Sequence, residues 1–294
     1  MDLAFVVNPT KASTLRALVR ARACAGSGAH GLALWTPAVA ALQKRADYAG
    51  EADGWPLTDD PAAADAVVAL GGDGTLLQAV RLLRGTPRPL LGVNLGSLGF
   101  LTDTPEELLE ESLTRLLSGQ YRIDRRMLLD VGFEPLGQPP LHTIGLNDVV
   151  LHGPRARVLE LEIAVGGVKL ARMLADGVLV ATPSGSTAYN LSAGGPVVSP
   201  LLDALILTPI SAHTLSQRPL VVGADEAIEI TLVRTASERA ELTVDGHVSH
   251  EMNVGDRVIV TRAQATVSLV VTRERTFYDT LRTKLGWGHR GRSV

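Results

Sequence analysis

The sequence predicts an α/β protein with a second, β-rich part: an N-terminal doubly wound α/β domain over residues 1–120 and a C-terminal antiparallel β-rich, sandwich-like domain over residues 121–272. In the first part, short apolar runs alternate with helix-like stretches, which is typical of parallel strands joined by crossover helices. In the second part, apolar and polar residues alternate one by one, as in antiparallel strands with one buried face. The segment 273–294 is expected to return to the first domain.

Four short, mostly apolar runs are the predicted strands of the first domain: Leu3–Val7, Gly31–Trp35, Asp65–Leu70 and Pro89–Asn94. A helix is expected after the first strand, ending at about Arg22. Ligands of doubly wound sheets bind beyond the carboxyl ends of the strands. The loops that follow the last two strands are therefore where a binding site is expected.

A further helix is predicted close to the end of the first domain. Thr104 is placed as its cap, Pro105 in its first turn, and Glu107 as the partner that completes a capping box. Leucines at helical spacing predict its buried face, namely Leu109, Leu113, Leu116 and Leu117. The pair Ser118-Gly119 is expected to end it.

Alternating patterns mark the strands of the second domain. The run Leu159–Val165 alternates strictly, and Gly166-Gly167 then offers a turn. Residues 228–232 alternate in the same way. The segment Leu242–Val244, followed by Asp245-Gly246, is a hairpin signal. Residues 258–260 and 267–271 continue the pattern.

The composition is that of an ordinary soluble globular protein, with 20% charged and 46% apolar residues in 294. A net charge of −3, without a basic block apart from residues 289–292, makes nucleic acid and anionic membrane poor partners. The single cysteine, Cys24, excludes a disulfide framework and a thiolate metal cluster within one chain. No apolar stretch approaches the roughly 20 residues of a membrane span, and the N-terminus does not resemble a signal peptide, so a cytoplasmic location is expected.

The first chemical signal is Gly71-Gly72-Asp73-Gly74-Thr75, which lies between a predicted strand and a predicted helix. Glycines bring backbone N–H groups close to an anion, and a helix N-terminus adds partial positive charge. The carboxylate of Asp73 would repel phosphate, unless it holds a metal or takes a proton from an attacking hydroxyl. The turn is neither a Walker loop nor a dinucleotide fingerprint. It favours a kinase over the alternative, a tight turn with a helix-capping aspartate.

The second signal, Asn94–Thr102, also follows a predicted strand and carries two glycines and one aromatic residue. Phe100 could stack on a base or fill a gap in the core at the domain junction, and the sequence leaves both readings open.

The third signal is the long segment 176–196, in which a strand runs into small, hydroxyl-bearing and glycine residues. Five serine or threonine side chains lie between Thr182 and Ser192. They offer many hydrogen bonds in little volume, as a polyhydroxylated or phosphorylated ligand needs. Neither Ser184 nor Ser192 has the flanking glycines of a hydrolase nucleophile elbow. Close helix packing alone would not require so many hydroxyl groups.

Taken together, the three segments resemble the NAD kinase family. The family's G-G-D-G-T, N-x-G-x-L-G-F-L and T-P-(S/T)-G-S-T-A-Y-x-x-S-A-G-G-P motifs appear here in order, and residues 207–220 are similar to the segment that follows them. The resemblance runs from about Ala66 to the C-terminus. The first motif is shared with lipid kinases, whereas the third is much more specific.

The resemblance implies a role for each matching residue. Asp73 is the expected catalytic residue, acting on the 2′-hydroxyl of the adenosine ribose of NAD. The expected phosphate and ATP contacts are Gly71, Gly72, Gly74 and Thr75. The expected NAD contacts, some of them made across a subunit interface, are Asp73, Gly74, Phe100, Asn147, Asp148, Asp176, Thr187, Ala188, Tyr189, Asn190, Leu191, Ser192 and His247.

Three positions depart from the family pattern. Asp148 replaces the usual glutamate with a shorter acid, His247 stands where glutamine is usual, and Leu174 occupies a position that is often basic or polar. The hydrophobic Leu174 removes one charged contact to the ligand.

The implied reaction is transfer of the γ-phosphoryl group of ATP, or of a phosphoryl group of inorganic polyphosphate, to NAD, giving NADP. The implied cofactor is a divalent cation, Mg²⁺, and the implied assembly is a homodimer or homotetramer. Two alternatives remain open at this stage: a lipid or other small-molecule kinase that shares only the first motif, and an NADP(H)-binding sensor without catalysis.

Overall fold

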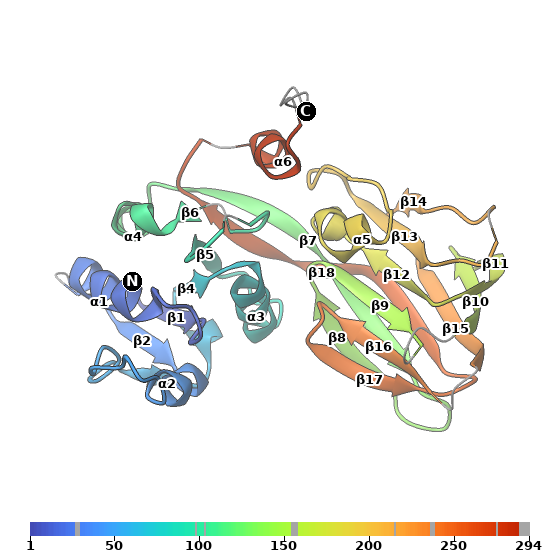
Figure 1. The fold of residues 1–294 in the computed structure, drawn as a ribbon, viewed down its shortest axis with the longest axis horizontal. Helices are drawn as coiled ribbons and strands as arrows, with labels where there is room; N and C mark the ends of the chain where they lie inside the picture. The colour runs from blue at the N-terminus through green and yellow to red at the C-terminus, as the bar shows by residue number, and fades with distance from the viewer. Residues whose placement is uncertain are drawn as a thin grey trace, which may run out of the picture. The chain divides into compact units, whose positions relative to one another are not determined.

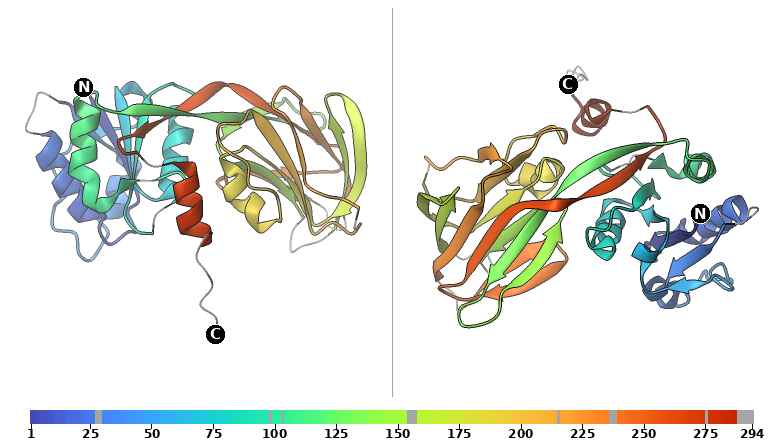
Figure 2. Two further views of the ribbon diagram at one scale, coloured as in Figure 1. Left: turned by 90° about the horizontal axis from the view of Figure 1, so that it is seen from above. Right: turned by 180° about the vertical axis from the view of Figure 1, so that it is seen from behind.

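The computed structural model describes residues 1–26, 30–97, 99–102, 104–153, 158–214, 216–235, 239–274 and 276–287. The chain forms two compact units, shown in Figure 1: Met1–Arg125 with Val267–Val294, and Arg126–Thr266. It passes from one unit to the other within two long strands, β7 (Arg122–Glu134) and β18 (Arg257–Val271), which Figure 2 shows in green and red. The C-terminal segment therefore belongs to the first unit.

The first unit is built on a parallel sheet in the order β3-β2-β1-β4-β5. Its strands are β1 (Leu3–Val7), β2 (Leu32–Trp35), β3 (Leu57–Thr58), β4 (Ala66–Gly71) and β5 (Pro89–Asn94). The end of β18 pairs in parallel with β5 through Ser268 and Leu269. Because each apolar run of the sequence is covered on both faces, all four predicted strands are found, each within one residue of its predicted ends. The doubly wound α/β prediction is confirmed.

The helices of this unit are α1 (Thr14–Ala25), α2 (Thr36–Leu42), α3 (Asp73–Leu83), α4 (Leu109–Leu117) and α6 (Phe277–Leu285), with short 3₁₀ turns η1 (Pro61–Ala63) and η2 (Glu106–Leu108). The core joins the fully buried strand residues Leu3 and Phe5 to Leu18 of α1 and Leu113 of α4. Leu109, Leu113 and Leu116 are buried as predicted, and Gly119 follows α4 in the left-handed conformation, at φ +74°. No helix among the described residues has both the length and the apolar character that a bilayer crossing needs.

The predicted capping box at Thr104 is wrong. Thr104 and Pro105 form a short strand, β6, that pairs in parallel with Val93 and Asn94 of β5. A residue that precedes proline is pushed toward extended conformations, and the pairing partner on β5 then fixes Thr104 in the sheet. Helix α4 begins later, at Leu109, without a side-chain cap. A capping box is found instead at α6, where Thr276 and Asp279 bond to each other's backbone N–H groups.

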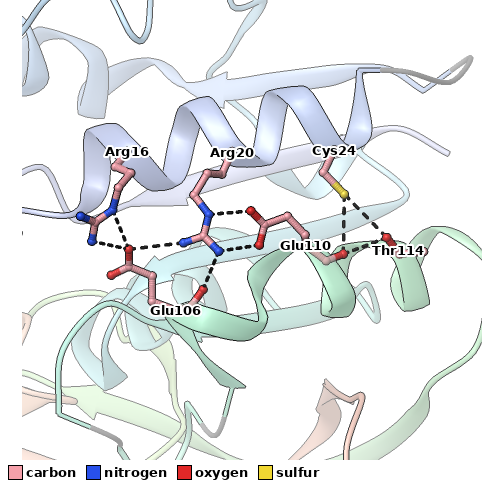
Figure 3. A network of polar contacts seen from close by, with 6 residues as sticks. All are labelled: Arg16, Arg20, Cys24, Glu106, Glu110 and Thr114. Carbon is pink, nitrogen blue, oxygen red and sulfur yellow. Dashed lines mark hydrogen bonds and ion pairs between the residues drawn. The ribbon is translucent and has the colours of Figure 1, made fainter.

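Helices α1 and α4 are joined by a line of polar contacts, shown in Figure 3. The guanidinium of Arg20 donates to both carboxylate oxygens of Glu110, each at 2.5 Å, and Arg16 donates to Glu106 at 2.7 Å. The bond to Arg20 holds the pKa of Glu110 below its ordinary value. At the far end, Cys24 Sγ lies 3.6 Å from the carbonyl oxygen of Glu110.

The second unit contains two antiparallel sheets. The first has the order β11-β10-β15-β18, with β7 and β8 (Leu141–Gly145) paired alongside; its other strands are β10 (Leu159–Val165), β11 (Val168–Ala175) and β15 (Ile228–Thr235). The second has the order β14-β13-β12-β9-β16-β17; its strands are β9 (Asp148–His152), β12 (Gly177–Ala181), β13 (Ala204–Ile210), β14 (Leu220–Gly223), β16 (Ala240–Val244) and β17 (Val248–Met252).

One core lies between the two sheets of this unit. Leu161 and Ile230 from the first sheet belong to the same buried cluster as Leu151, Val178 and Leu242 from the second. The predicted antiparallel, sandwich-like arrangement is therefore confirmed. On the outer face of the second sheet, a 3₁₀ turn η3 (Gly185–Thr187) and the short helix α5 (Tyr189–Ser192) follow β12. Both turns predicted from glycines are present: Gly166-Gly167, and Asp245-Gly246 with φ of 50° and 65°.

Candidate functional site

The glycine turn of the first unit lies at the carboxyl end of β4 and leads into α3. Gly72 is the N-cap of the helix and Asp73 its first residue. The N–H groups of Thr75 and Leu76 donate to the carbonyl oxygen of Gly72, at 2.9 and 3.1 Å. Within the described part of the chain, no hydrogen bond uses the N–H of Asp73 or of Gly74. Two donors at the positive end of a helix are thus available to an anion.

The three glycines of this turn differ in the space around the position that a Cβ atom would take. A Cβ built on Gly72 or Gly74 would meet no other atom within 4 Å, so both backbone faces are open. A Cβ on Gly71 would lie 2.1 Å from Thr75 Oγ1, inside the van der Waals contact distance. Gly71 is therefore required for packing at the end of β4, whereas Gly72 and Gly74 leave space in front of the helix.

The Asp73 carboxylate connects this turn to the segment Asn94–Thr102. Its Oδ1 accepts the N–H of Leu101, the N–H of Thr102 and the Thr102 hydroxyl, at 3.3, 2.9 and 2.8 Å. Among the described residues, its Oδ2 accepts one hydrogen bond, from the N–H of Phe100 at 2.9 Å. Because each carboxylate oxygen offers about two lone pairs, Oδ2 keeps the capacity to accept one more hydrogen bond or a proton.

Asn94 organises the same segment from the end of β5. Its amide nitrogen donates to the carbonyl oxygen of Ser97 and to the Thr102 hydroxyl, both at 2.9 Å, and its Oδ1 accepts the N–H of Gly96. The side chain is 3% exposed, so these bonds are shielded from water. Leu98 of this motif lies outside the described residues. Phe100 is half-buried, and its ring centroid lies 5.8 Å from Lys284 Nζ of α6.

Lys11 is a candidate that the sequence reasoning missed. It follows β1, which lies next to β4 in the sheet, and its Nζ lies 3.1 Å from the position that a Cβ on Gly96 would take. The Arg45 guanidinium fixes this loop by donating to the carbonyl oxygens of Pro9, Lys11 and Ala12. An ammonium group thus stands over the second glycine segment. The only signal in the sequence was a lysine shortly after a predicted strand.

The second unit contains a cavity of about 660 Å³ along β9, with further lining residues from β13, β16 and the turn before β12. Its lining residues include five of the predicted NAD contacts: Asn147, Asp148, Asp176, Ala188 and Tyr189. The lining also includes residues that were not predicted as ligand contacts, namely Val150, His152, Gly153, Ile210, Ser211, Thr243, Asp245 and Gly246. Of the remaining predicted contacts in this unit, Thr187, Asn190, Leu191, Ser192 and His247 are not among the lining residues.

Asn190 does not line the cavity, and its side chain instead makes hydrogen bonds inside the protein. The side chain is fully buried; its nitrogen donates to the carbonyl oxygens of Ser186 and Pro196, and its oxygen accepts the Thr208 hydroxyl. Its amide thereby holds the segment around α5 against β13. The sequence motif marks this residue equally well for either role.

Residues of the segment 176–196 hold the backbone of Leu146 and of Asn147, which lines the cavity. Thr182 donates from its hydroxyl to the carbonyl oxygen of Leu146 at 2.6 Å and from its N–H to that of Asn147 at 2.9 Å. A Cβ on Gly185 would lie 2.0 Å from the Asn147 carbonyl oxygen, so only glycine fits there. The side chain of Asn147 is 9% exposed, and its Oδ1 has no hydrogen-bond partner among the described residues. A buried polar atom without a partner at a cavity is suited to a ligand donor.

Two carboxylates stand together at this cavity. Burial, and then the negative charge of Asp245, raise the pKa of Asp148 to about 7. Burial also raises the pKa of Asp245, although three backbone N–H bonds and His247 oppose the rise. Among the described residues, no group of three or more His, Cys, Asp or Glu side chains could hold a metal ion.

The open N-terminus of α3 with the Asp73 carboxylate, and the polar cavity of the second unit, are features expected of a phosphotransferase that acts on a small polar molecule. The comparisons with known proteins identify the family. Residues 56–121 match the ATP-NAD kinase N-terminal domain, and residues 146–272 match the ATP-NAD kinase C-terminal domain. The chain belongs to the NAD kinase family, a family of phosphotransferases.

The relatives cover most of the chain. An NAD kinase of Geobacter sulfurreducens is 44% identical over 246 residues, covering 83% of this chain and 86% of the relative, and an NAD kinase of Cellvibrio japonicus is 42% identical over 225 residues, covering 76% and 75%. Among solved structures, yeast NADH kinase in complex with NADH has a TM-score of 0.89 at 27% identity, covering all of this chain and 89% of that one. An NAD kinase from Archaeoglobus fulgidus in complex with ATP shares the fold, with a TM-score of 0.75 at 24% identity, over 97% of this chain and 99% of that one.

Proposed function

We propose that the chain is an NAD kinase that transfers the γ-phosphoryl group of ATP to the 2′-hydroxyl of the adenosine ribose of NAD, giving NADP. The observation that carries this proposal is the glycine turn at α3, where the N–H groups of Asp73 and Gly74 make no hydrogen bond to any described residue and Asp73 also supplies a carboxylate. Membership of the family supplies the identity of the acceptor.

Backbone groups of the first unit are proposed to bind the phosphates of the donor. The N–H groups of Asp73 and Gly74 and the positive end of α3 would hold donor phosphate oxygens, with Gly72 giving open access. Gly71 would shape this turn through its packing, and the buried Thr75 would support it from within the helix. Lys11 would add a positive charge near the second glycine segment.

A divalent cation, Mg²⁺, fits this site as part of the donor. Mg²⁺ keeps several waters and is bound largely through substrate phosphates, so few protein ligands would be needed. When bound, the cation neutralises charge on the triphosphate.

The proton of the attacking hydroxyl would pass to Asp73. Its Oδ2 accepts a single hydrogen bond from the described part of the chain, so it would take the proton. In the same step the ribose oxygen would bond to the γ-phosphorus and the bond to the β–γ bridging oxygen would break, releasing ADP. The bonds to Oδ1 would hold the carboxylate in one orientation during this step.

In the first unit, the residues proposed to contact NAD are Asp73, Gly74 and Phe100. In the second unit, the cavity residues Asn147, Asp148, Asp176, Ala188 and Tyr189 would make direct contacts. Thr187, Leu191, Ser192 and His247 are proposed to act at the margin of the cavity, and Asn190 to hold the wall in place. Polar side chains around a cavity of this size suit a dinucleotide.

A cytoplasmic location and a homo-oligomeric assembly are proposed as well. The proposal of a homo-oligomer rests on β11, which is an edge strand of its sheet. This strand carries exposed apolar residues: Val168 and Leu170 are 70% and 48% exposed, and Leu174 is exposed as well. Exposed apolar edge strands tend to pair with another chain. Light scattering after size-exclusion chromatography tests this, since a monomer at micromolar concentration would overturn it.

The test of function is NADP formation from NAD, ATP and Mg²⁺, with the Asp73→Asn variant run in parallel. Product from the wild type and little from the variant supports the assignment. Without product from either, inorganic polyphosphate replaces ATP as donor. Tight NADP binding without turnover on both donors would favour the non-catalytic sensor instead.

A further inference from the structure

The turn between β16 and β17 is tied to the segment that precedes β9. The Asp245 carboxylate accepts the N–H groups of Leu146, Asn147 and Asp148, at 2.8, 2.7 and 3.2 Å. In return, the N–H of Asp245 donates to the Asp148 carbonyl oxygen at 2.9 Å. Four hydrogen bonds thus link two segments that lie far apart in the sequence. They fix the backbone of Asn147 and Asp148, two residues that line the cavity.

The two carboxylates of this cluster differ in what surrounds them. Asp245 has backbone donors on both of its oxygens, which favours its charged form. Asp148 is 5% exposed, and no described residue donates a hydrogen bond to its carboxylate. A negative neighbour and little solvent both disfavour a charge on Asp148. When the pair holds one proton, that proton therefore belongs on Asp148.

We propose that Asp245 is a positioning residue for nucleotide binding: it fixes the backbone of residues 146–148, and its negative charge keeps Asp148 as a neutral acid that donates a hydrogen bond to the bound dinucleotide. This inference rests on the proposed function and deepens it, because it makes NAD affinity depend on pH. Asn147, the residue before Asp148, adds an acceptor, because its Oδ1 has no hydrogen-bond partner in the described part of the chain. The cavity thus offers the ligand both a donor and an acceptor.

Other titratable groups lie at or near this part of the cavity. Asp176, from the turn before β12, and Tyr189, from α5, line it. His247 is not a lining residue, but its charge acts on Asp245 from the same turn. His152 of β9 lies 3.8 Å from Glu241 of β16. A histidine could produce a pH dependence in the same range, so the test must separate the histidines from Asp148.

The experiment measures the Kd of NAD by calorimetry between pH 5.5 and 8.5, without donor. If only the protonated form binds, Kd rises by up to about tenfold per pH unit above the pKa of Asp148, near 7. The Asp148→Asn variant carries a permanent amide donor, so its Kd should stay near the low-pH wild-type value across the range. Infrared spectroscopy supplies a second readout, because the band of a protonated carboxyl group should disappear in this variant.

The Asp245→Asn variant tests the positioning role. Asparagine tolerates the left-handed conformation that Asp245 adopts, at φ 50°, so the turn should be retained. Loss of the charge should shift the midpoint of the pH profile downward. The amide also presents donors to backbone N–H groups, so Kd should rise at every pH, and Asp245→Glu should restore the pH midpoint more than the affinity.

Several outcomes would overturn the inference while leaving the function intact. NAD binding that tightens with rising pH and is lost in Asp148→Asn would show that the ligand needs the carboxylate. A pH dependence that survives Asp148→Asn but vanishes in His247→Gln or His152→Gln would assign it to a histidine. Absence of NAD binding at every pH would instead contradict the proposed function itself.

Discussion

The two carboxylate oxygens of Asp73 have different roles. Oδ1 is occupied by three donors from residues 101 and 102, and Oδ2 by one donor from Phe100. A Cβ on Gly99 would lie 1.9 Å from Oδ1, so a side chain at position 99 would overlap the Asp73 carboxylate. The residue proposed to take the proton is therefore also the residue that holds the second glycine segment in place.

Replacing Asp73 by Asn should reduce kcat by roughly 10²- to 10⁴-fold, the usual contribution of a general base. An amide group cannot accept at both oxygen positions, so one donor of residues 100–102 would face an NH₂ group, and KM should rise as well. Steady-state kinetics measures both values. The control is Thr102→Val, which removes one donor to Oδ1 but keeps the base and should lower kcat far less. Equal losses in the two variants would assign Asp73 a purely structural role.

Gly71 and Gly72 provide a matched pair. Gly72→Val should fold normally, because its Cβ meets open space, yet raise the KM for ATP by obstructing the phosphate site. Gly71→Ala should destabilise the fold by about 1–3 kcal/mol through its overlap with Thr75. Thermal unfolding and kinetics distinguish the two effects. Normal kinetics in Gly72→Val would contradict backbone contact with phosphate.

Lys11 should contribute to donor binding through its charge. Lys11→Met removes the ammonium and should raise the KM for ATP roughly 10- to 100-fold, as expected for a hydrogen bond to a charged group worth about 1.5–3 kcal/mol. Lys44→Met, at another exposed lysine of the same unit, should change little. If the two variants behave alike, the position of Lys11 over Gly96 has no role in binding the donor.

At the scale of elements, the contact between α1 and α4 combines a polar edge with an apolar core. Arg20 and Glu110 are 28% and 44% exposed at their side chains, so solvent screens their pairing. Leu113, in contrast, is fully buried against the sheet. The apolar face, more than the ion pairs of Figure 3, should therefore hold α4 in place.

Two variants measure that difference. Glu110→Gln should lower the free energy of unfolding by less than about 1 kcal/mol. Leu113→Ala should lower it by about 2–5 kcal/mol through the cavity it leaves. Urea denaturation followed by circular dichroism provides both values. A larger effect from Glu110→Gln than from Leu113→Ala would reverse this ranking.

The elements also show what sequence reasoning can reach. The strands of the first unit were predictable because an apolar run of the right length records burial directly. Thr104 was misplaced because its partner, Val93 of β5, is visible only in three dimensions. Likewise, the glycine motifs located the site, but Asp245 was missed because its role depends on a bond to Asn147, 98 residues away in the sequence.

For the whole molecule, Asp148 links stability to pH. Its pKa in the folded state, about 7, lies above the ordinary 3.8, so between these values the native state keeps a proton that the unfolded chain releases. The free energy of unfolding should therefore fall as pH rises from about 4 to 7, by at most about 4 kcal/mol from this group, and level off above that.

The Asp148→Asn variant should lack this part of the decline and be the more stable protein at pH 8. Urea midpoints measured at pH 5 and pH 8 for both proteins give the comparison. A wild-type decline that persists unchanged in the variant would mean that Asp148 does not hold the proton.

The division of the first unit between two stretches of chain has a consequence for biosynthesis. The start of β5 pairs with Ser268 and Leu269 of β18, which leave the ribosome long after β5 itself. At 5–20 residues per second, this half of β5 waits on the order of ten seconds or more for its partner. During that time it is an uncovered apolar sheet edge, open to pairing with another chain. The newborn protein is thus most exposed to aggregation while its second unit is being made, and its first unit is the last to be completed.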